Sequence, residues 1–173
     1  RREGSTMVVS AGGQNLEFAL ALVGAHVTEC VLAAVAGALA LGVPLEAVAR
    51  GLPSVVPGRG RMRPVTLPNG VLLLDDAYNA NPRSLEYALR TAADQARDRG
   101  GRAIAVVGDM RELGADAERV DDEAGRRAAS LGIALVVGAG DLGARIARAA
   151  GGRPVESIEQ AAALVREIWR DGD

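Results

Sequence analysis

A short run rich in carboxylate and carboxamide side chains is the part of the sequence best suited to chemistry. The run is Asp75-Asp76-Ala77-Tyr78-Asn79-Ala80-Asn81-Pro82, and it follows the apolar stretch Val71-Leu72-Leu73-Leu74. In open α/β sheets, ligands bind at the carboxyl ends of the strands, so the run has the position of a site. A carboxylate at this edge can accept hydrogen bonds from two ribose hydroxyl groups, and a tyrosine ring can line a base or sugar. We therefore expect Asp75, Tyr78 and Asn79 to bind a nucleotide.

Asp76 and Asn81 of the same run also have plainer explanations. Side chains alternate along a strand, so Asp76 is expected on the face opposite Asp75, in solvent or against a basic partner. Asn81 is expected to cap a helix that begins with Pro82, a position where proline loses no needed hydrogen bond. Both residues remain candidates for a substrate cleft beside the nucleotide. For the run as a whole, a helix cap with spare polar side chains is the competing explanation.

A second polar loop follows the next predicted strand. Its sequence is Gly108-Asp109-Met110-Arg111-Glu112-Leu113-Gly114. If the two strands are neighbours, this loop lies beside the first one and faces the same cleft. Asp109 and Glu112 are therefore further candidates for substrate contacts, and a simple entry into the following helix is the alternative.

Three arginines, Arg59, Arg61 and Arg63, precede the first loop in a stretch rich in proline and glycine. The planar guanidinium group can bind phosphate oxygens through two parallel hydrogen bonds. A linker arginine beside a nucleotide site is thus a natural phosphate contact. For Arg59 and Arg63, a solvated hinge is the preferred interpretation.

The single histidine, His26, stands four residues before the single cysteine, Cys30. Because no partner ligands lie nearby in the sequence, a core or capping role is favoured over metal binding. No metal site is predicted, and His26 is kept as a further candidate site residue.

The pattern Gly138-x-Gly140-x-x-Gly143 follows a predicted strand and opens a helix, as a dinucleotide-binding fingerprint does. It comes after the third strand of its domain, whereas the fingerprint belongs to the first turn between a strand and a helix. A dehydrogenase-like site is therefore disfavoured.

The composition excludes several classes of protein. The 173 residues contain no lysine, because all twenty basic residues are arginine, so this chain cannot form a Walker A loop or a Schiff base. One cysteine excludes an internal disulfide. A net charge of −2 without a basic stripe argues against nucleic acid as a partner. Membrane insertion is not expected either, since no apolar run approaches the roughly 18 residues needed to span a bilayer.

The elements that must position the candidate residues alternate between strands and helices. From residue 58 onward, strands are expected at Val71–Leu74, Ala103–Val107, Ile133–Val137 and near Val155. Helices are expected after Asn81, over Asp116–Ser130 and Asp141–Ala150, and through Trp169 from a capping box of Ser157 with Gln160. This alternation indicates an α/β, Rossmann-like domain with a mostly parallel sheet flanked by helices.

The first 57 residues have a different pattern. Thr6–Ser10 and Leu16–Leu22 are expected to form a hairpin around Gly12-Gly13, followed by helices at about Thr28–Leu41 and Leu45–Gly51. The stretch Pro53–Pro64 is expected to be a linker. The sequence thus predicts two domains: an incomplete one over residues 1–57 and the Rossmann-like one over residues 58–173.

The two polar loops also carry a family resemblance. The runs Leu74–Ser84 and Val107–Gly114 are similar, in order and spacing, to motifs of the Mur ligases. Upstream, Gly60-Arg61-Met62 resembles the junction between the central and C-terminal domains of that family, and Gly24-x-His26 resembles its Gly-Arg-His-Asn segment. The resemblance covers nearly the whole chain.

The resemblance implies a fragment of a cytoplasmic enzyme of peptidoglycan assembly. Residues 58–173 would be the C-terminal domain, and residues 1–57 the last part of the central ATP-binding domain. The parent enzyme would use ATP and Mg²⁺ to join D-alanyl-D-alanine to a UDP-linked muramoyl tripeptide through an acyl phosphate. Asp75 would hold the ATP ribose, Arg61 would reach its phosphates, and Tyr78 and Asn79 would line the nucleotide side of the cleft.

The resemblance also implies that the isolated chain is inactive. The UDP-binding domain, the phosphate loop and the lysine that the family carbamylates to bind magnesium are not in this sequence, and no catalytic residue is assigned. Two positions depart from the family, since Val27 replaces an asparagine and Asp121 replaces a frequent histidine. A non-catalytic ligase-like module that binds a nucleotide or a partner protein is the alternative function.

Overall fold

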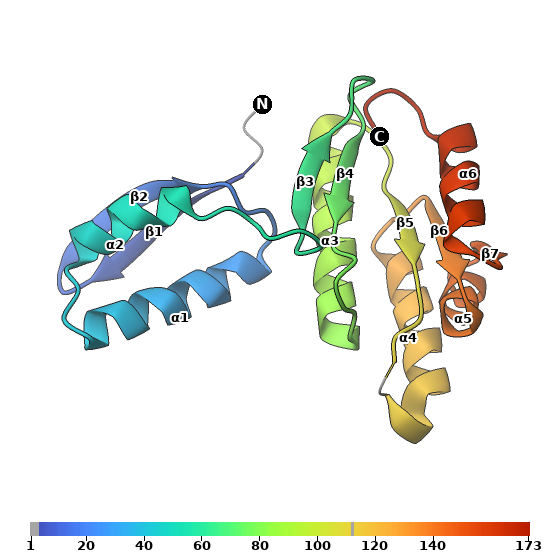
Figure 1. Cartoon of the computed structure of the whole chain (residues 1–173), viewed down its shortest axis with the longest axis horizontal. Coiled ribbons are helices and arrows are strands. Elements are labelled where there is room, and N and C mark those ends of the chain that lie inside the picture. Colours follow the sequence, from blue (N-terminus) through green and yellow to red (C-terminus); the bar gives the residue numbers. More distant parts are fainter. Residues whose placement is uncertain (1–3, 112) are drawn as a thin grey trace.

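A β-hairpin and two helices form a small lobe in the computed structural model, which describes residues 4–111 and 113–173 (Figure 1). Strands β1 (Ser5–Ala11) and β2 (Gln14–Leu20) pair antiparallel. Helices α1 (His26–Ala40) and α2 (Leu45–Gly51) follow, and a 3₁₀ turn, η1 (Leu52–Ser54), ends the lobe. The predicted hairpin and both predicted helices are confirmed.

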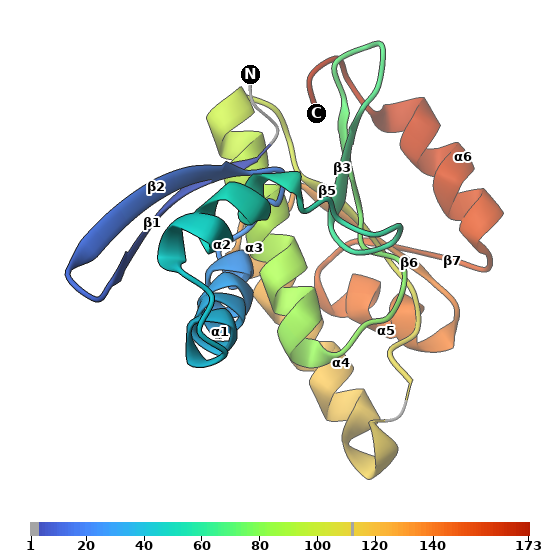
Figure 2. The same cartoon turned by 60° about the vertical axis from the view of Figure 1, so that its left-hand side comes forward.

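The small lobe has a core of its own. Val27, Val31 and Val35 recur every four residues along α1 and are buried against apolar residues of the hairpin such as Phe18. Figure 2 shows α1 and the hairpin facing each other, with the start of α1 directed toward α3 of the other lobe.

The large lobe contains the remaining strands and helices. In chain order they are β3 (Arg63–Thr66), β4 (Leu72–Asp75), α3 (Pro82–Arg99), β5 (Ile104–Val107), η2 (Gly114–Asp116), α4 (Ala117–Ser130), β6 (Leu135–Ala139), α5 (Asp141–Ala149), β7 (Arg153–Val155) and α6 (Ile158–Ile168). Strands β5, β6 and β7 form a parallel sheet in that order, whereas β3 and β4 form a separate antiparallel pair.

Helices cover both faces of the parallel sheet, as expected for a Rossmann-like α/β fold. Val136 of β6 belongs to the core beneath α3, α4 and α5. Its neighbour Val137 points to the opposite face and packs with Ala161 of α6. None of the helices among the described residues is long and apolar enough to cross a membrane.

Two expectations about the first strand of this lobe are wrong. The predicted buried strand Val71–Leu74 is β4, and it pairs antiparallel with β3, which begins at Arg63 inside the predicted linker. Leu73 is 51% exposed, because β4 pairs with the short β3 outside the parallel sheet. An apolar run alone does not distinguish a central strand from one with an open face.

The helix ends follow local rules of capping. Asn81 Oδ1 accepts a hydrogen bond from Ser84 N at 2.9 Å, so Asn81 caps α3 as predicted. Asn81 N also donates to Ser84 Oγ at 3.0 Å, which completes a capping box that was not predicted. The box expected at α6 is only half formed. Ser157 accepts from Gln160 N, but the Gln160 side chain accepts from Glu156 N rather than from the cap residue.

Hydrogen bonds of Asp173 support β4. The main-chain oxygen of Asp173 accepts a hydrogen bond from Leu72 N at 2.8 Å. The Asp173 carboxylate binds the Arg102 guanidinium, with Nη2 at 2.6 Å from Oδ2, and also accepts from Arg170 N. These contacts hold the strand that carries Asp75.

Candidate functional site

The two carboxylates at the end of β4 hold the preceding linker by its backbone. Asp75 Oδ2 accepts a hydrogen bond from Gly60 N at 3.0 Å, and Asp75 Oδ1 accepts a long one from Ala77 N at 3.4 Å. Asp76 Oδ1 accepts from Met62 N at 2.9 Å. The linker residues 60–62 are thereby tied to the carboxyl end of the strand, and Arg61 is placed between two anchored residues.

The anchored linker has an unusual backbone conformation. Gly60 has φ = 70° and Met62 has φ = 51°, both in the left-handed region that side chains disfavour. The carbonyl of Gly60 accepts a hydrogen bond from Tyr78 N at 3.1 Å, and the Met62 side chain is only 6% exposed. Burial of Met62 and the bonds to the two carboxylates stabilise this strained turn.

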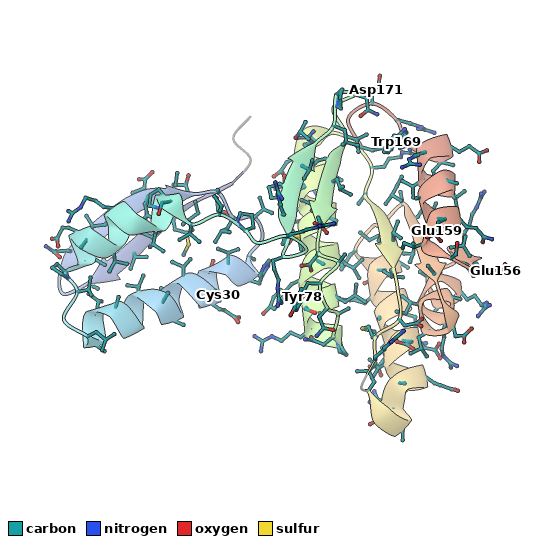
Figure 3. The ribbon with its side chains drawn as sticks, in the orientation of Figure 1. Cys30, Tyr78, Glu156, Glu159, Trp169 and Asp171 are labelled. Carbon is teal, nitrogen blue, oxygen red and sulfur yellow. The ribbon has the colours of Figure 1, made fainter. Side chains whose placement is uncertain are left out.

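Arg61 and Tyr78 form an open pair on this turn. The guanidinium carbon of Arg61 lies 3.8 Å from the centre of the Tyr78 ring, a cation–π contact. Tyr78 is 68% exposed, and Figure 3 shows it on the side of the large lobe nearer the small lobe. Within the described part of the chain, Arg61 forms no ion pair, so its hydrogen-bond donors are available to an anionic ligand.

The structure places the candidates Arg61, Asp75 and Tyr78 close together and leaves Asn79 exposed beside them. Asp76 is half-buried and lies within the field of Arg61, so of its two expected surroundings, solvent or a basic partner, the structure favours the basic partner. Burial raises the pKa of the Asp76 carboxyl above its ordinary value, outweighing the Met62 N–H group and the positive charges of His26 and Arg61.

His26 begins α1 and lies against α3 of the large lobe. Its ring centre is 5.5 Å from that of Tyr87, and its Nδ1 atom is buried without a hydrogen-bond partner among the described residues. Cys30, four residues later, is exposed. The position of His26 is therefore at the contact between the two lobes.

The same contact contains three residues that sequence reasoning missed. Glu29 of α1 accepts a hydrogen bond from Arg83 Nη2 at 2.9 Å through Oε2, and from the Tyr87 hydroxyl at 3.1 Å through Oε1. Arg83 and Tyr87 are four residues apart and so share one face of α3. The four-residue spacing could have indicated that Arg83 and Tyr87 bind one partner together. Nothing in the sequence, however, identifies Glu29 as that partner.

Asp109 has an internal role at the end of β5. Its Oδ1 atom accepts hydrogen bonds from Leu142 N at 2.9 Å and from Gly143 N at 3.0 Å. The cap residue of α5, Gly140, supplies no side chain to these N–H groups, so Asp109 caps the helix from another loop. Glu112, the other candidate in this loop, lies outside the described residues.

The capping by Asp109 and the close approach of β6 to α5 together explain the glycine pattern at 138–143. A side chain at Gly140 would place its Cβ 2.6 Å from Asp109 Oδ1, and one at Gly138 would collide with the Gly143 carbonyl. In a dinucleotide site, the N-terminus of this helix would face a pyrophosphate. Here the Asp109 carboxylate occupies that position.

The two polar loops thus bind different partners. Among the described residues, β4 pairs with β3 and β5 pairs with β6, so the strands that precede the two loops are not paired with each other. A hollow of about 250 Å³ lies between β1, the start of α1 and the middle of α3, and none of the candidate residues lines it. The loop after β4, with its exposed arginine and tyrosine, is the better candidate for a ligand.

Comparison with known proteins assigns the chain to a family. A family model of the Mur ligase, glutamate ligase domain matches residues 60–173. The chain belongs to the Mur ligase family. Its fold agrees, since the structure of MurF from Acinetobacter baumannii superposes with a TM-score of 0.83 at 27% identity, over 96% of this chain and 36% of that one.

The relatives of this Mur ligase chain are longer than it is. The UDP-N-acetylmuramoyl-tripeptide:D-alanyl-D-alanine ligase of Escherichia coli is 36% identical over 137 residues, which are 79% of this chain and 29% of the relative. The ligase of the same name from Mycobacterium tuberculosis is 36% identical over 160 residues, 91% of this chain and 29% of the relative. The chain therefore spans 29% of the length of these curated relatives.

A further solved Mur ligase supports the fold alone. MurF of Thermotoga maritima, crystallised in complex with ADP, has a TM-score of 0.82 at 21% identity, over 100% of this chain and 39% of that one. The α/β architecture is therefore that of the C-terminal part of Mur ligases, and the family membership predicted from the two loops is confirmed.

Proposed function

We propose that this chain is part of a cytoplasmic, ATP-dependent amide ligase that adds D-alanyl-D-alanine to UDP-N-acetylmuramoyl-tripeptide in peptidoglycan precursor synthesis. The names of the Escherichia coli and Mycobacterium tuberculosis relatives support this activity. Residues 1–57 are then the end of a central ATP-binding domain, and residues 58–173 are the C-terminal domain. The remainder of the parent enzyme supplies the UDP-binding domain and the phosphate loop.

The main support for the proposal is the Arg61–Tyr78 pair, which lies on the turn that Asp75 and Asp76 anchor. An exposed guanidinium without a carboxylate partner fits a nucleotide phosphate, and an exposed aromatic ring fits a base or sugar. Asp75 has an oxygen with only one long hydrogen bond, at 3.4 Å, which suits a ribose hydroxyl. These features favour a nucleotide on this surface.

The proposed role of the chain is to position and shield bound ATP. When bound, ATP supplies the phosphoryl group that activates the substrate carboxylate as an acyl phosphate. Arg61 binds and orients the phosphates, Asp75 holds the ribose, and Tyr78 and Asn79 exclude water from the nucleotide side. Asp76, Asn81, Asp109 and Glu112 remain candidates for the substrate side, although Asn81 Oδ1 and Asp109 Oδ1 already accept backbone hydrogen bonds.

Mg²⁺ and the reacting groups belong to the rest of the enzyme in this proposal. Among the described residues, no group of three or more histidine, cysteine or acidic side chains could hold a metal ion. The isolated chain should therefore release no ADP when mixed with ATP, Mg²⁺, D-alanyl-D-alanine and the UDP-linked tripeptide. Turnover of these substrates by the purified chain would contradict this assignment.

Calorimetric titration of ATP into the 173-residue chain tests the nucleotide site. We expect weak binding that Arg61→Leu reduces by about tenfold, because one charge-assisted phosphate contact contributes roughly 1.5 kcal/mol. Arg59→Leu is the matched control, since Arg59 is an exposed linker arginine two residues away. Equal affinities of both variants and the unaltered chain would refute the role of Arg61. Absence of any ATP binding would refute the site itself.

A further inference from the structure

The most deeply buried acidic side chain in the described structure lies outside the candidate site. Asp121 of α4 has an exposed fraction of 0%, and neither of its carboxylate oxygens has a hydrogen-bond partner among the described residues. An ionised carboxylate in such a place loses its hydration without any compensating donor, which is strongly unfavourable.

Asp121 shares the face of α4 that packs closely on α5. Gly125, one turn further along α4, has no room for a side chain, because a Cβ there would collide with the main-chain oxygen of Ile146. Ala128 and Ile146 are fully buried in the same seam. We call this contact, formed by Asp121, Gly125 and Ala128 with the facing residues of α5, the α4–α5 seam.

Arg145, the positive charge that acts on Asp121, is already bound to other carboxylates. Arg145 of α5 donates to both oxygens of Asp122, from Nε at 2.8 Å and from Nη2 at 2.9 Å. Its Nη1 atom lies 3.0 Å from Glu118 Oε2, and its Nε atom also donates to the Glu118 carbonyl. The guanidinium therefore contributes an attractive field at Asp121 but no hydrogen bond.

The other charges acting on Asp121 are negative. Asp109 lies in the loop after β5, where one of its oxygens binds the first N–H groups of α5, and Asp122 follows Asp121 on α4. Burial is the main reason why the pKa of Asp121 is raised, the negative charges of Asp109 and Asp122 raise it further, and Arg145 opposes them.

We propose that the α4–α5 seam takes up one proton at Asp121 when the large lobe folds, so that rising pH weakens the seam. The neutral acid can be buried at a modest cost, whereas the carboxylate cannot.

The sign of the pH dependence follows from proton linkage. Above the ordinary pKa of aspartate, about 4, the unfolded chain has lost the proton while the folded chain keeps it. The contribution of Asp121 to stability is therefore complete below this pH and is lost as the pH rises toward the raised pKa. Over that interval, the unfolding equilibrium constant should increase about tenfold per pH unit from this one group.

Urea unfolding of the 173-residue chain between pH 4 and pH 8 tests the proposal. Asp121→Asn should equal the unaltered chain in stability near pH 4 and exceed it near pH 8, because the amide cannot ionise. Glu123→Gln is the matched control, since it alters an exposed acid of the same helix that pairs with Arg119, and it should preserve the loss of stability at high pH. A difference between Asp121→Asn and the unaltered chain that does not change with pH would overturn the proposal.

Infrared spectroscopy gives a second test that needs no change at Asp121. Asp76 is the other described carboxyl group whose pKa is raised, so Asp76→Asn is used as the background. As the pH is raised above the ordinary pKa of aspartate, we expect a carboxylic acid C=O band that persists in the folded chain and disappears on unfolding in urea. Absence of this band in the folded chain would overturn the proposal.

Discussion

The loops that follow β4 and β5 both use an aspartate to bind backbone N–H groups, but they bind different kinds of segment. Asp75 and Asp76 hold a linker that has no regular structure, and this leaves Arg61 and Tyr78 exposed above it. Asp109 holds the first turn of α5 inside the lobe. The same local pattern, a strand followed by aspartate, thus supports an exposed surface in one loop and internal packing in the other.

The two loops differ in how many backbone N–H groups a single carboxylate oxygen accepts. One oxygen of Asp109 accepts two N–H groups and also meets the positive end of the α5 dipole. Asp75 and Asp76 each accept one linker N–H group at 3.0 Å or less. We therefore expect substitutions in the second loop to affect stability most, and substitutions in the first loop to affect ligand binding as well.

The largest effect is expected for Asp109→Ala. It leaves the Leu142 and Gly143 N–H groups without an acceptor and should lower the free energy of unfolding by roughly 2 kcal/mol. Urea unfolding measures this change. Asp141→Ala is the control, because Asp141 is an exposed acid in the first turn of the same helix and accepts none of these bonds. Equal losses in both variants would show that helix charge, not capping, decides the stability.

A smaller effect is expected for Gly60→Ala in the first loop. The new Cβ would lie 3.0 Å from Tyr78 N, in a backbone with φ = 70°, so the free energy of unfolding should fall by about 1 to 2 kcal/mol. Gly58→Ala is the matched control, since its Cβ would meet only Arg61 Cγ at 3.8 Å. On the proposed function, Gly60→Ala also weakens ATP binding, measured by calorimetry. Unchanged stability would contradict the strained turn.

The smallest effect on stability is expected for Asn81→Ala, and it distinguishes the role of Asn81 from that of Asn79 in the first loop. Asn81→Ala removes the cap of α3 and should lower the free energy of unfolding by about 1 kcal/mol. Asn79 is exposed, so Asn79→Ala should leave the thermal midpoint unchanged and weaken ATP binding instead. Thermal unfolding and calorimetry on both variants measure the two effects. If Asn79→Ala destabilises the chain as much as Asn81→Ala, the division of roles in this loop is wrong.

The elements predicted well were those whose signals are local. Asn81 with Pro82, and Ser157 before α6, lie within a few residues of the helices they begin. The pairing of β3 with β4 was missed because β3 lies partly inside a stretch rich in proline and glycine, and the apolar run of β4 resembled a fully buried strand.

The candidate site was only partly predictable for the same reason. The residue types at Asp75 and Tyr78 indicated ligand binding, whereas their partners are 15 or more residues distant in the chain. Asp75 binds Gly60 N, and Asp109 binds N–H groups 33 and 34 residues away. Contacts of this kind depend on the tertiary fold and leave no pattern in a short window of sequence.

The bonds from Asp75 and Asp76 to the linker determine where the chain can pivot. Residues 60–62 are hydrogen-bonded to the large lobe. A rotation of the small lobe relative to the large lobe would therefore have its hinge at residues 55–59, between η1 and this bonded segment. Such a rotation would break the contacts of Glu29 with Arg83 and Tyr87. Arg61 would remain over Tyr78 throughout, so the pair would move with the large lobe as a unit and would not have to form again after each movement.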